Sequence, residues 1–285
     1  MHRIAPFELQ GHRGARALFP ENTLEGFLAT LALGVDAIEL DIAVTEDGVP
    51  VVTHDPALNL DLVRGPDGRF LDRPGPLLSS LRVAELAAYD VGQIRPGSDL
   101  ARRFPLQAAR DGLRIPTLEA VLAATRLAPA RFDVELKTSP RQPDDTVPPE
   151  AMAACVLKVA QQGAALDRVV IRSFDWRCLD AMRSLAPAMK LVWLSEAADS
   201  ATLAAVRDAA QDSKTPGWAP FHGGLTQERV AEAHASGLRV LPWTVNEPER
   251  MATLIAWGVD GICTDDPVVA RRVMAEMGMP LPRGG

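Results

Sequence analysis

The sequence predicts an α/β fold in which eight parallel strands and the helices between them close into a (β/α)8 barrel, with a small inserted subdomain after the second strand. Short runs of strand-forming residues alternate with helical segments almost to the end of the chain, a pattern typical of βα units around a parallel sheet. With 285 residues and 47% hydrophobic content, the chain can bury one large core. We therefore expect a single domain over residues 1–285.

Eight segments are predicted to form the barrel, in the manner of a TIM barrel. They are residues 7–12, 37–44, 131–137, 169–173, 190–194, 217–220, 239–245 and 259–263. The sixth is short and ends in proline, so it is assigned mainly by its position in the series. The first helix is expected after Asn22-Thr23 and the last at Pro267, where Asp265 and Asp266 are expected to act only as caps.

One β-rich run, residues 49–53, does not fit the eightfold count. It follows a turn signal at residues 45–48 too closely for a parallel crossover, which needs about a dozen residues or more. The run should therefore fold back on strand 37–44 as a hairpin. This would return His54 to the level of Leu40 and Asp41 and place an imidazole beside a carboxylate.

Residues 56–115 are predicted to form the small inserted subdomain, at the mouth of the barrel. The segment is rich in Pro, Gly, Arg and Asp, and its brief apolar periodicity is limited to Leu78, Leu81, Val83 and Leu86. It is too long for an ordinary loop inside a compact domain.

Composition and hydropathy argue against several kinds of partner. The formal charge of −7 and the lack of a basic stripe with interleaved aromatic residues argue against nucleic acid. The first eight residues lack the apolar core of a signal peptide, and no apolar run reaches the roughly 18 residues of a membrane span. Three widely spaced cysteines suit reduced thiols. We therefore expect a cytoplasmic protein without a stable membrane anchor, monomeric or homodimeric.

Three carboxylates are candidate metal ligands. Glu39 and Asp41 lie two apart in a strand, so both face one side, where buried like charges repel unless a cation or a proton separates them. Glu135 repeats the pattern on another strand, with Lys137 on its face; a structural ion pair between these two, or solvent-facing charges, is the alternative. Because active sites lie at the carboxyl ends of barrel strands, we favour a metal site. Oxygen ligands alone favour Mg²⁺ or Ca²⁺, with Mn²⁺ also compatible.

Two histidines are candidates for acid-base catalysis. His12 follows the first strand, where Arg13 and Gly14 can present a guanidinium and backbone amides to an anion. His54 is expected to reach the carboxylates from the hairpin. A lone histidine is more often a packing or surface residue, but these two converge from different segments. Two imidazoles across a phosphate can serve as base and acid near neutral pH.

Two other residues have alternative roles. Trp243 is either a core residue or, at the barrel mouth, an apolar wall for a glycerol or lipid-like group. Glu21 either orients Arg13 or favours the start of the first helix.

Motifs spread along the chain resemble, in their order, the glycerophosphodiester phosphodiesterase family of the bacterial, cytosolic type. They are His12-Arg13-Gly14, Pro20–Thr23, Glu39-Leu40-Asp41, His54-Asp55, Glu135–Lys137, Ser173-Phe174, Trp243–Asn246 and Gly258–Gly261. Each motif alone is weak, but the ordered set is specific and covers most of the chain. One departure from the family pattern is Arg172, where members often have glutamine.

The resemblance implies a (β/α)8 barrel with an insertion and a hydrolase of lipid and glycerol metabolism. Its activity would be metal-dependent hydrolysis of small glycerophosphodiesters, such as glycerophosphocholine and glycerophosphoethanolamine, to sn-glycerol 3-phosphate and an alcohol. Carried over residue by residue, the resemblance implies that Glu39, Asp41 and Glu135 bind one divalent cation. His12 and His54 would be the acid-base pair. The substrate-binding residues would be Arg13, Lys137 and Trp243.

The sequence leaves alternatives open. The nucleophile is either water or the glycerol 2-hydroxyl of the substrate. A lysophospholipase D-type phosphodiesterase of the same fold would need an apolar groove at the mouth, and the residues that could line it, or form the core of the insertion instead, are Phe70, Leu71, Leu77, Leu78 and Tyr89. An aldolase-like lyase would use Lys137 as a Schiff-base nucleophile, although a lysine beside Glu135 should stay charged. A non-catalytic binding barrel is the third alternative.

Overall fold

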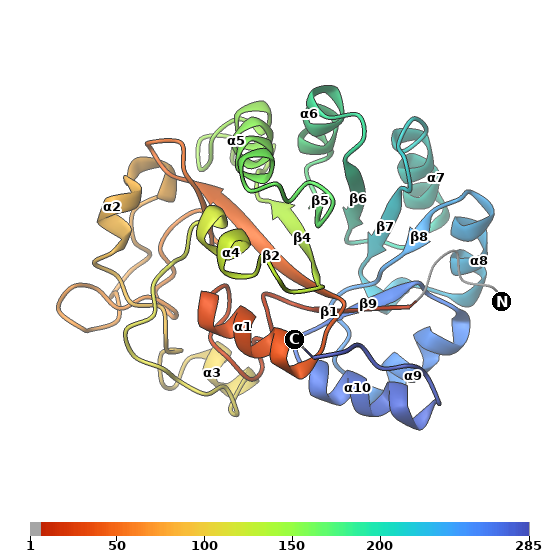
Figure 1. Ribbon diagram of the computed structural model, residues 1–285, viewed down its shortest axis with the longest axis horizontal. Coiled ribbons are helices and arrows are strands. Elements are labelled where there is room, and N and C mark those ends of the chain that lie inside the picture. The colour runs from red at the N-terminus through yellow and green to blue at the C-terminus, as the bar shows by residue number, and fades with distance from the viewer. Residues whose placement is uncertain (1–6, 285) are drawn as a thin grey trace.

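The computed structural model describes residues 7–284, whose strands form a nearly closed parallel barrel with helices on the outside (Figure 1). The barrel strands are β1 (Glu8–Gly11), β2 (Ala37–Val44), β4 (Arg131–Leu136), β5 (Val169–Ser173), β6 (Lys190–Ser195), β7 (Gly217–Pro220), β8 (Arg239–Val240) and β9 (Gly261–Thr264). The strand order is β8-β7-β6-β5-β4-β2-β1-β9. The predicted (β/α)8 fold is therefore confirmed, including the short sixth strand.

The predicted strand 239–245 is wrong in its length, since β8 ends at Val240. Pro242 accepts a backbone hydrogen bond from Cys263 (3.0 Å) but has no N–H to donate, which interrupts a regular ladder with β9. Single hydrogen bonds join the two segments instead, from Asp260 N to Val240 O (2.9 Å) and from Val245 N to Cys263 O (2.8 Å). They complete the barrel.

The helices that connect the strands lie around the barrel (Figure 1). They are α1 (Leu24–Leu33), α4 (Leu118–Ala124), α5 (Pro149–Gln162), α6 (Trp176–Leu185), α7 (Ser200–Ala209), α8 (Gln227–Ala235), α9 (Pro248–Trp257) and α10 (Pro267–Glu276), with a short 3-10 helix, η2 (His222–Gly224), after β7. Thr23 caps α1 by accepting from Gly26 N (3.1 Å), and Asp266 caps α10. None of the helices within residues 7–284 is long and apolar enough to span a bilayer.

The predicted hairpin is confirmed. The strand β3 (Pro50–Val52) pairs antiparallel with β2, with Ile42 opposite Val52. The next rung is a hydrogen bond from Thr53 N to Asp41 O (3.0 Å). This register brings His54 to the level of Asp41 near the carboxyl end of β2, as the turn predicted.

Residues 56–115 pack on this hairpin. The segment holds η1 (Leu78–Ser80), α2 (Val83–Leu86) and α3 (Asp99–Arg103). Its apolar side chains share one buried cluster with the hairpin, which includes Ala43, Val51, Leu58, Val63, Leu78 and Leu86, with Leu71 and Tyr89 packed against it. Leu71, Leu78 and Tyr89 are thus packing residues of this cluster. That the segment is a separate subdomain stays a prediction.

The barrel interior has a polar half and an apolar half. Side chains from β1, β2 and β4 that face inward are charged or amide groups, and Gln10 there donates to Asp133 (2.9 Å). Strands β5, β6 and β7, with the residue that follows β8, instead supply an apolar cluster of Val170, Val192, Leu194, Ala219 and Leu241. Because β2 is buried on both faces, its alternate residues pack toward the helices while Glu39 and Asp41 face the polar interior. The functional groups collect on this side.

Candidate active site

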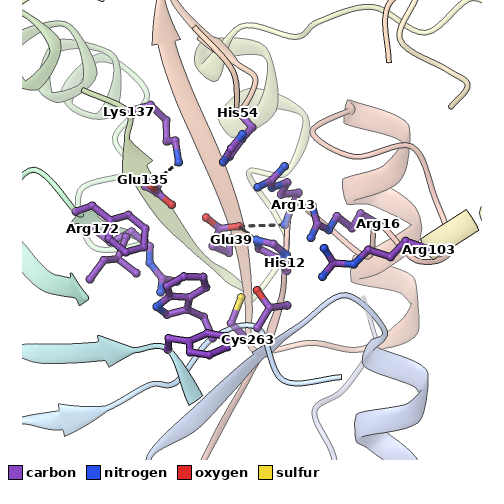
Figure 2. Close-up of a pocket in the computed structure, with 15 residues that line it drawn as sticks. His12, Arg13, Arg16, Glu39, His54, Arg103, Glu135, Lys137, Arg172 and Cys263 are labelled. Atoms are coloured by element: carbon purple, nitrogen blue, oxygen red, sulfur yellow. Dashed lines mark hydrogen bonds and ion pairs between the residues drawn. The ribbon is translucent and has the colours of Figure 1, made fainter. Parts of the chain in front are cut away.

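A cavity of about 290 Å³ opens at the carboxyl ends of the strands. Its lining includes His12, Arg13, Glu39, His54, Glu135, Lys137 and Trp243, which are seven of the eight predicted site residues. Figure 2 labels six of these residues, all except Trp243, and shows their side chains pointing inward from the ends of several strands and from the loops that follow. Asp41, the eighth, is fully buried behind the cavity wall.

The three carboxylates form one buried cluster. Glu39, Asp41 and Glu135 each offer an oxygen within 4.8 Å of the others. Alternation along β2 puts the first two on one face, and the parallel register sets Asp41 beside Glu135 of β4. The predicted grouping is therefore present.

Burial disfavours the ionised form of the carboxylates in this cluster, and so does the repulsion between them. Burial and the neighbouring Asp41 raise the pKa of Glu39 to about 8. Burial also opposes ionisation of Asp41, but Arg13, His54, Lys137 and the hydrogen bond from Asn22 together outweigh burial and hold the pKa of Asp41 well below its usual range. Oδ1 of Asp41 is buried and has no hydrogen-bond partner among the described residues. Three oxygen donors with an unsatisfied oxygen among them fit a hard divalent cation.

Lys137 lies beside the cluster and makes the ion pair with Glu135 that the sequence offered as the alternative to a metal site. Its Nζ is 2.7 Å from Glu135 Oε1 and 3.7 Å from Asp41 Oδ1. Burial lowers the pKa of Lys137, but these two carboxylates outweigh burial and raise it overall. The ammonium therefore stays charged, which disfavours a Schiff-base nucleophile.

Arg13 is held at the edge of the cluster by a strained turn. Its φ of 50° lies in the left-handed region, and its backbone N donates to Glu39 Oε2 (3.1 Å). The guanidinium donates to Glu21 (2.8 Å) and lies 3.2 Å from Asp41. Glu21 thus orients Arg13, and Asn22 in turn donates to Asp41 (2.9 Å).

The two histidines reach the cavity from separate segments. Nε2 of His12 is 3.9 Å from Glu39, and Nδ1 of His54 is 2.8 Å from its neighbour Asp55. Burial lowers the pKa of His12 to about 4, despite the opposing effect of Asp265, so its imidazole is neutral at neutral pH. The predicted convergence on one cavity is present (Figure 2).

Asp265 was expected only to cap the last helix, and this expectation is wrong. Asp266 alone makes the cap, while Asp265 is buried and lies 2.6 Å from His12 Nδ1. It also accepts from Arg16 (2.6 Å) and Asn246 (2.7 Å). The signal in the sequence is the presence of two consecutive acidic residues where one N-cap position exists.

Arg172 is a further residue that the sequence did not assign to the site. It is almost fully buried, lines the cavity and lies 3.2 Å from Gln10 Oε1. Its Nε has no hydrogen-bond partner among the described residues. A fixed cation therefore stands at the polar side of the cavity floor (Figure 2).

An aromatic wall faces these charged groups. The Trp243 ring contacts Phe174 edge-on, with 5.2 Å between ring centroids, and lies 5.6 Å from Phe221. Its indole N–H donates to Ala219 O (3.0 Å), which fixes the ring at the mouth. Trp243 is half-buried and lines the cavity, so it is a wall residue and not a core residue.

Comparisons with known proteins point to one family. A model of the glycerophosphoryl diester phosphodiesterase family matches residues 12–269. The chain is similar to the glycerophosphodiester phosphodiesterase of Bacillus subtilis, with 32% identity over 271 residues, 92% of this chain and 84% of the relative. It is also similar to that of Caldanaerobacter subterraneus subsp. tengcongensis, with 29% identity over 256 residues, 90% of this chain and 93% of the relative.

Solved structures are similar to the whole fold of this chain. A protein of Silicibacter pomeroyi assigned as a glycerophosphoryl diester phosphodiesterase superposes with a TM-score of 0.88 at 36% identity, over 98% of this chain and 96% of that one. An Oleispira antarctica phosphodiesterase, in complex with the product sn-glycerol-3-phosphate, has a TM-score of 0.76 at 23% identity, over 94% of this chain and 96% of that one.

Proposed function

The chain belongs to the glycerophosphoryl diester phosphodiesterase family, and we propose that it hydrolyses glycerophosphodiesters to sn-glycerol 3-phosphate and an alcohol with one divalent cation and two histidines. The enzyme is a phosphoric diester hydrolase. The observation that carries the detailed proposal is the buried cluster of Glu39, Asp41 and Glu135, which shares one cavity with His12 and His54.

The three carboxylates would hold the cation. Their all-oxygen donor set favours Mg²⁺ or Ca²⁺, with Mn²⁺ also compatible. When bound, such an ion offsets negative charge on a phosphate oxygen. The residues of the chain supply the rest of the chemistry.

Arg13 and Lys137 bind the phosphate in this proposal. Both cations lie against the carboxylate cluster, and both line the cavity. Their charges stabilise the negative charge that develops on the phosphate oxygens in the transition state. Ion pairs with Glu21 and Glu135 hold the two side chains in place before substrate arrives.

His12 and His54 transfer the protons. One imidazole takes the proton of the nucleophile, which is either water or the 2-hydroxyl of the glycerol. Attack by the 2-hydroxyl would form a cyclic phosphate, which water then hydrolyses to sn-glycerol 3-phosphate. The other imidazole protonates the departing alcohol. His12 is suited to accept a proton because its Nδ1 faces Asp265, which leaves Nε2 directed to the cavity side.

The aromatic wall takes the glycerol group. Trp243, Phe174 and Phe221 offer ring faces to its carbon skeleton, opposite the charged floor. Glycerophosphocholine and glycerophosphoethanolamine are the substrates we propose to test first.

Release of sn-glycerol 3-phosphate from glycerophosphocholine by metal-stripped protein tests the proposal. We expect no turnover without metal, recovery with Mg²⁺ or Ca²⁺, and loss in Glu39→Gln. Glu119→Gln, an exposed change of the same kind on α4, is the matched control and should keep activity. Full turnover of the stripped protein in excess chelator, or full activity of Glu39→Gln, would contradict the metal site. Absence of hydrolysis with every glycerophosphodiester would contradict the substrate class.

A further inference from the structure

A second hollow of about 280 Å³ opens beside the catalytic cavity. It lies between the loop after β3 and the loop after β4, and its lining runs from His54 to Pro56 and includes Thr138, Gln142 and Asp145. The two hollows share His54, Glu135, Lys137 and Phe174. A phosphate held at these shared residues would have one compartment on each side.

A phosphodiester carries two alcohol groups and so needs two compartments. The first cavity has the aromatic wall that we assign to the glycerol. The second hollow, which we call the loop groove, is then the place for the other alcohol. Its position next to His54 sets the departing oxygen beside that imidazole.

The charges that line the loop groove are paired, with one exception. His54 is bonded to Asp55 (2.8 Å), and Lys137 is bonded to Glu135 (2.7 Å). Asp145 lines the groove half-buried, and its carboxylate has no hydrogen bond or ion pair among the described residues. Asp145 therefore presents a carboxylate with no partner of its own to whatever enters the groove.

The backbone of Asp145 is fixed in this position. Its N donates to Gln142 O (3.3 Å), and its carbonyl accepts from Ser79 Oγ of η1 (3.4 Å). The bond from Ser79 holds the loop after β4 to the segment 56–115 on the opposite side. The backbone of Asp145 is thus anchored at the groove wall, from which its carboxylate extends.

We propose that the loop groove binds the departing alcohol and that Asp145 makes the enzyme prefer alcohols that carry a positive charge, such as ethanolamine and choline. The proposal rests on the proposed glycerophosphodiesterase function and adds a specificity-determining residue to it. Asp145 is not one of the three carboxylates proposed to hold the cation, and it lines the groove assigned to the alcohol, so its charge acts on the alcohol.

The test compares kcat/KM for glycerophosphoethanolamine, glycerophosphocholine and the uncharged glycerophosphoglycerol. Asp145→Asn should lower kcat/KM for the two cationic substrates by about threefold to fivefold, as loss of one partly exposed ion pair does, and leave the uncharged substrate unchanged. Asp145→Lys should reverse the preference. Asp144→Asn is the matched control, because Asp144 is the exposed neighbour outside the groove. It should change none of the ratios.

Equal losses on all three substrates in Asp145→Asn, or no change on any, would overturn the assignment of Asp145. Either result would leave the glycerophosphodiesterase function intact. Failure of the unaltered enzyme to hydrolyse all three would instead overturn the proposed function and this proposal with it. Added salt should weaken the preference of the unaltered enzyme, because it screens the interaction of Asp145 with the ammonium group.

Discussion

Asp265 is the residue whose contacts most exceed what its sequence context suggested. Its carboxylate fixes the His12 ring through Nδ1 and is itself held by Arg16 and Asn246. A carboxylate in this place selects the tautomer that carries the proton on Nδ1. Asp265 is thus a positioning residue, since it acts on substrate through His12.

We expect Asp265→Asn to lower kcat by about 100-fold, because the amide no longer holds the required tautomer. The carboxylate also raises the pKa of His12 against burial, so the His12 pKa read by NMR should fall in the variant. Asp266→Asn is the matched control, since asparagine also caps helices and activity should be kept. A kcat reduced without any shift of the His12 resonance would point to a merely structural role.

The two histidines can be distinguished by the leaving group. His12→Ala and His54→Ala should each reduce turnover of glycerophosphocholine by about 100-fold or more. With the p-nitrophenyl ester of glycerol phosphate, whose phenolate departs without a proton, the variant that lacks the general acid should recover. The loop groove beside His54 predicts recovery of His54→Ala. Recovery of His12→Ala alone would reverse the assignment.

At the scale of elements, the consecutive residues Glu21, Asn22 and Thr23, which follow β1, have different roles. Glu21 holds Arg13, Asn22 holds Asp41, and Thr23 begins α1 by accepting from Gly26 N (3.1 Å) and donating to Pro20 O (2.7 Å). Only the first two residues act on the site. The third anchors the helix that supports them.

Thr23→Ala should therefore reduce stability more than it reduces catalysis. Loss of this N-cap is expected to lower the free energy of unfolding by about 1 kcal/mol, measured by urea denaturation. The kcat/KM at temperatures where the protein is folded should remain close to normal, and Thr23→Ser should recover the stability. A variant of unchanged stability but lost activity would assign Thr23 to the chemistry.

Elements and site residues that depend on local periodicity could be predicted from the sequence. Strand alternation placed Glu39 beside Asp41, and the short turn at residues 45–48 gave the register of His54. β8 is shorter than predicted because Pro242 has no N–H to donate to β9. The local sequence pattern does not show that β9 is the neighbour of this strand. The role of Asp265 depends on contacts across 253 residues, for which a single sequence carries no local signal.

At the scale of the whole molecule, the barrel interior combines a charged half with an apolar half. The charged half stores repulsion among Glu39, Asp41 and Glu135, which a bound cation would relieve. The apolar cluster from β5, β6, β7 and the residue that follows β8 supplies hydrophobic burial on the other side. Stability of the fold is thus linked to the ligand of the site.

We expect Mg²⁺ or Ca²⁺ to stabilise the metal-stripped protein by about 2.7 kcal/mol at about 100 times its Kd, seen as a higher midpoint of thermal unfolding. Glu39→Gln should lose most of this stabilisation, and the surface variant Glu119→Gln should keep it. An equal rise in both variants would mean that the ion binds elsewhere on the protein.

The pairing of β1 with β9 has a consequence for the synthesis of the protein. The first strand lies between β2 and β9. The ring of His12 is oriented by Asp265, which lies 253 residues further along the chain. A nascent polypeptide whose last strand is still inside the ribosome therefore has neither a closed barrel nor an oriented His12. The hydrolase can become active only after the chain has been synthesised past Asp265 and β9 has left the ribosome.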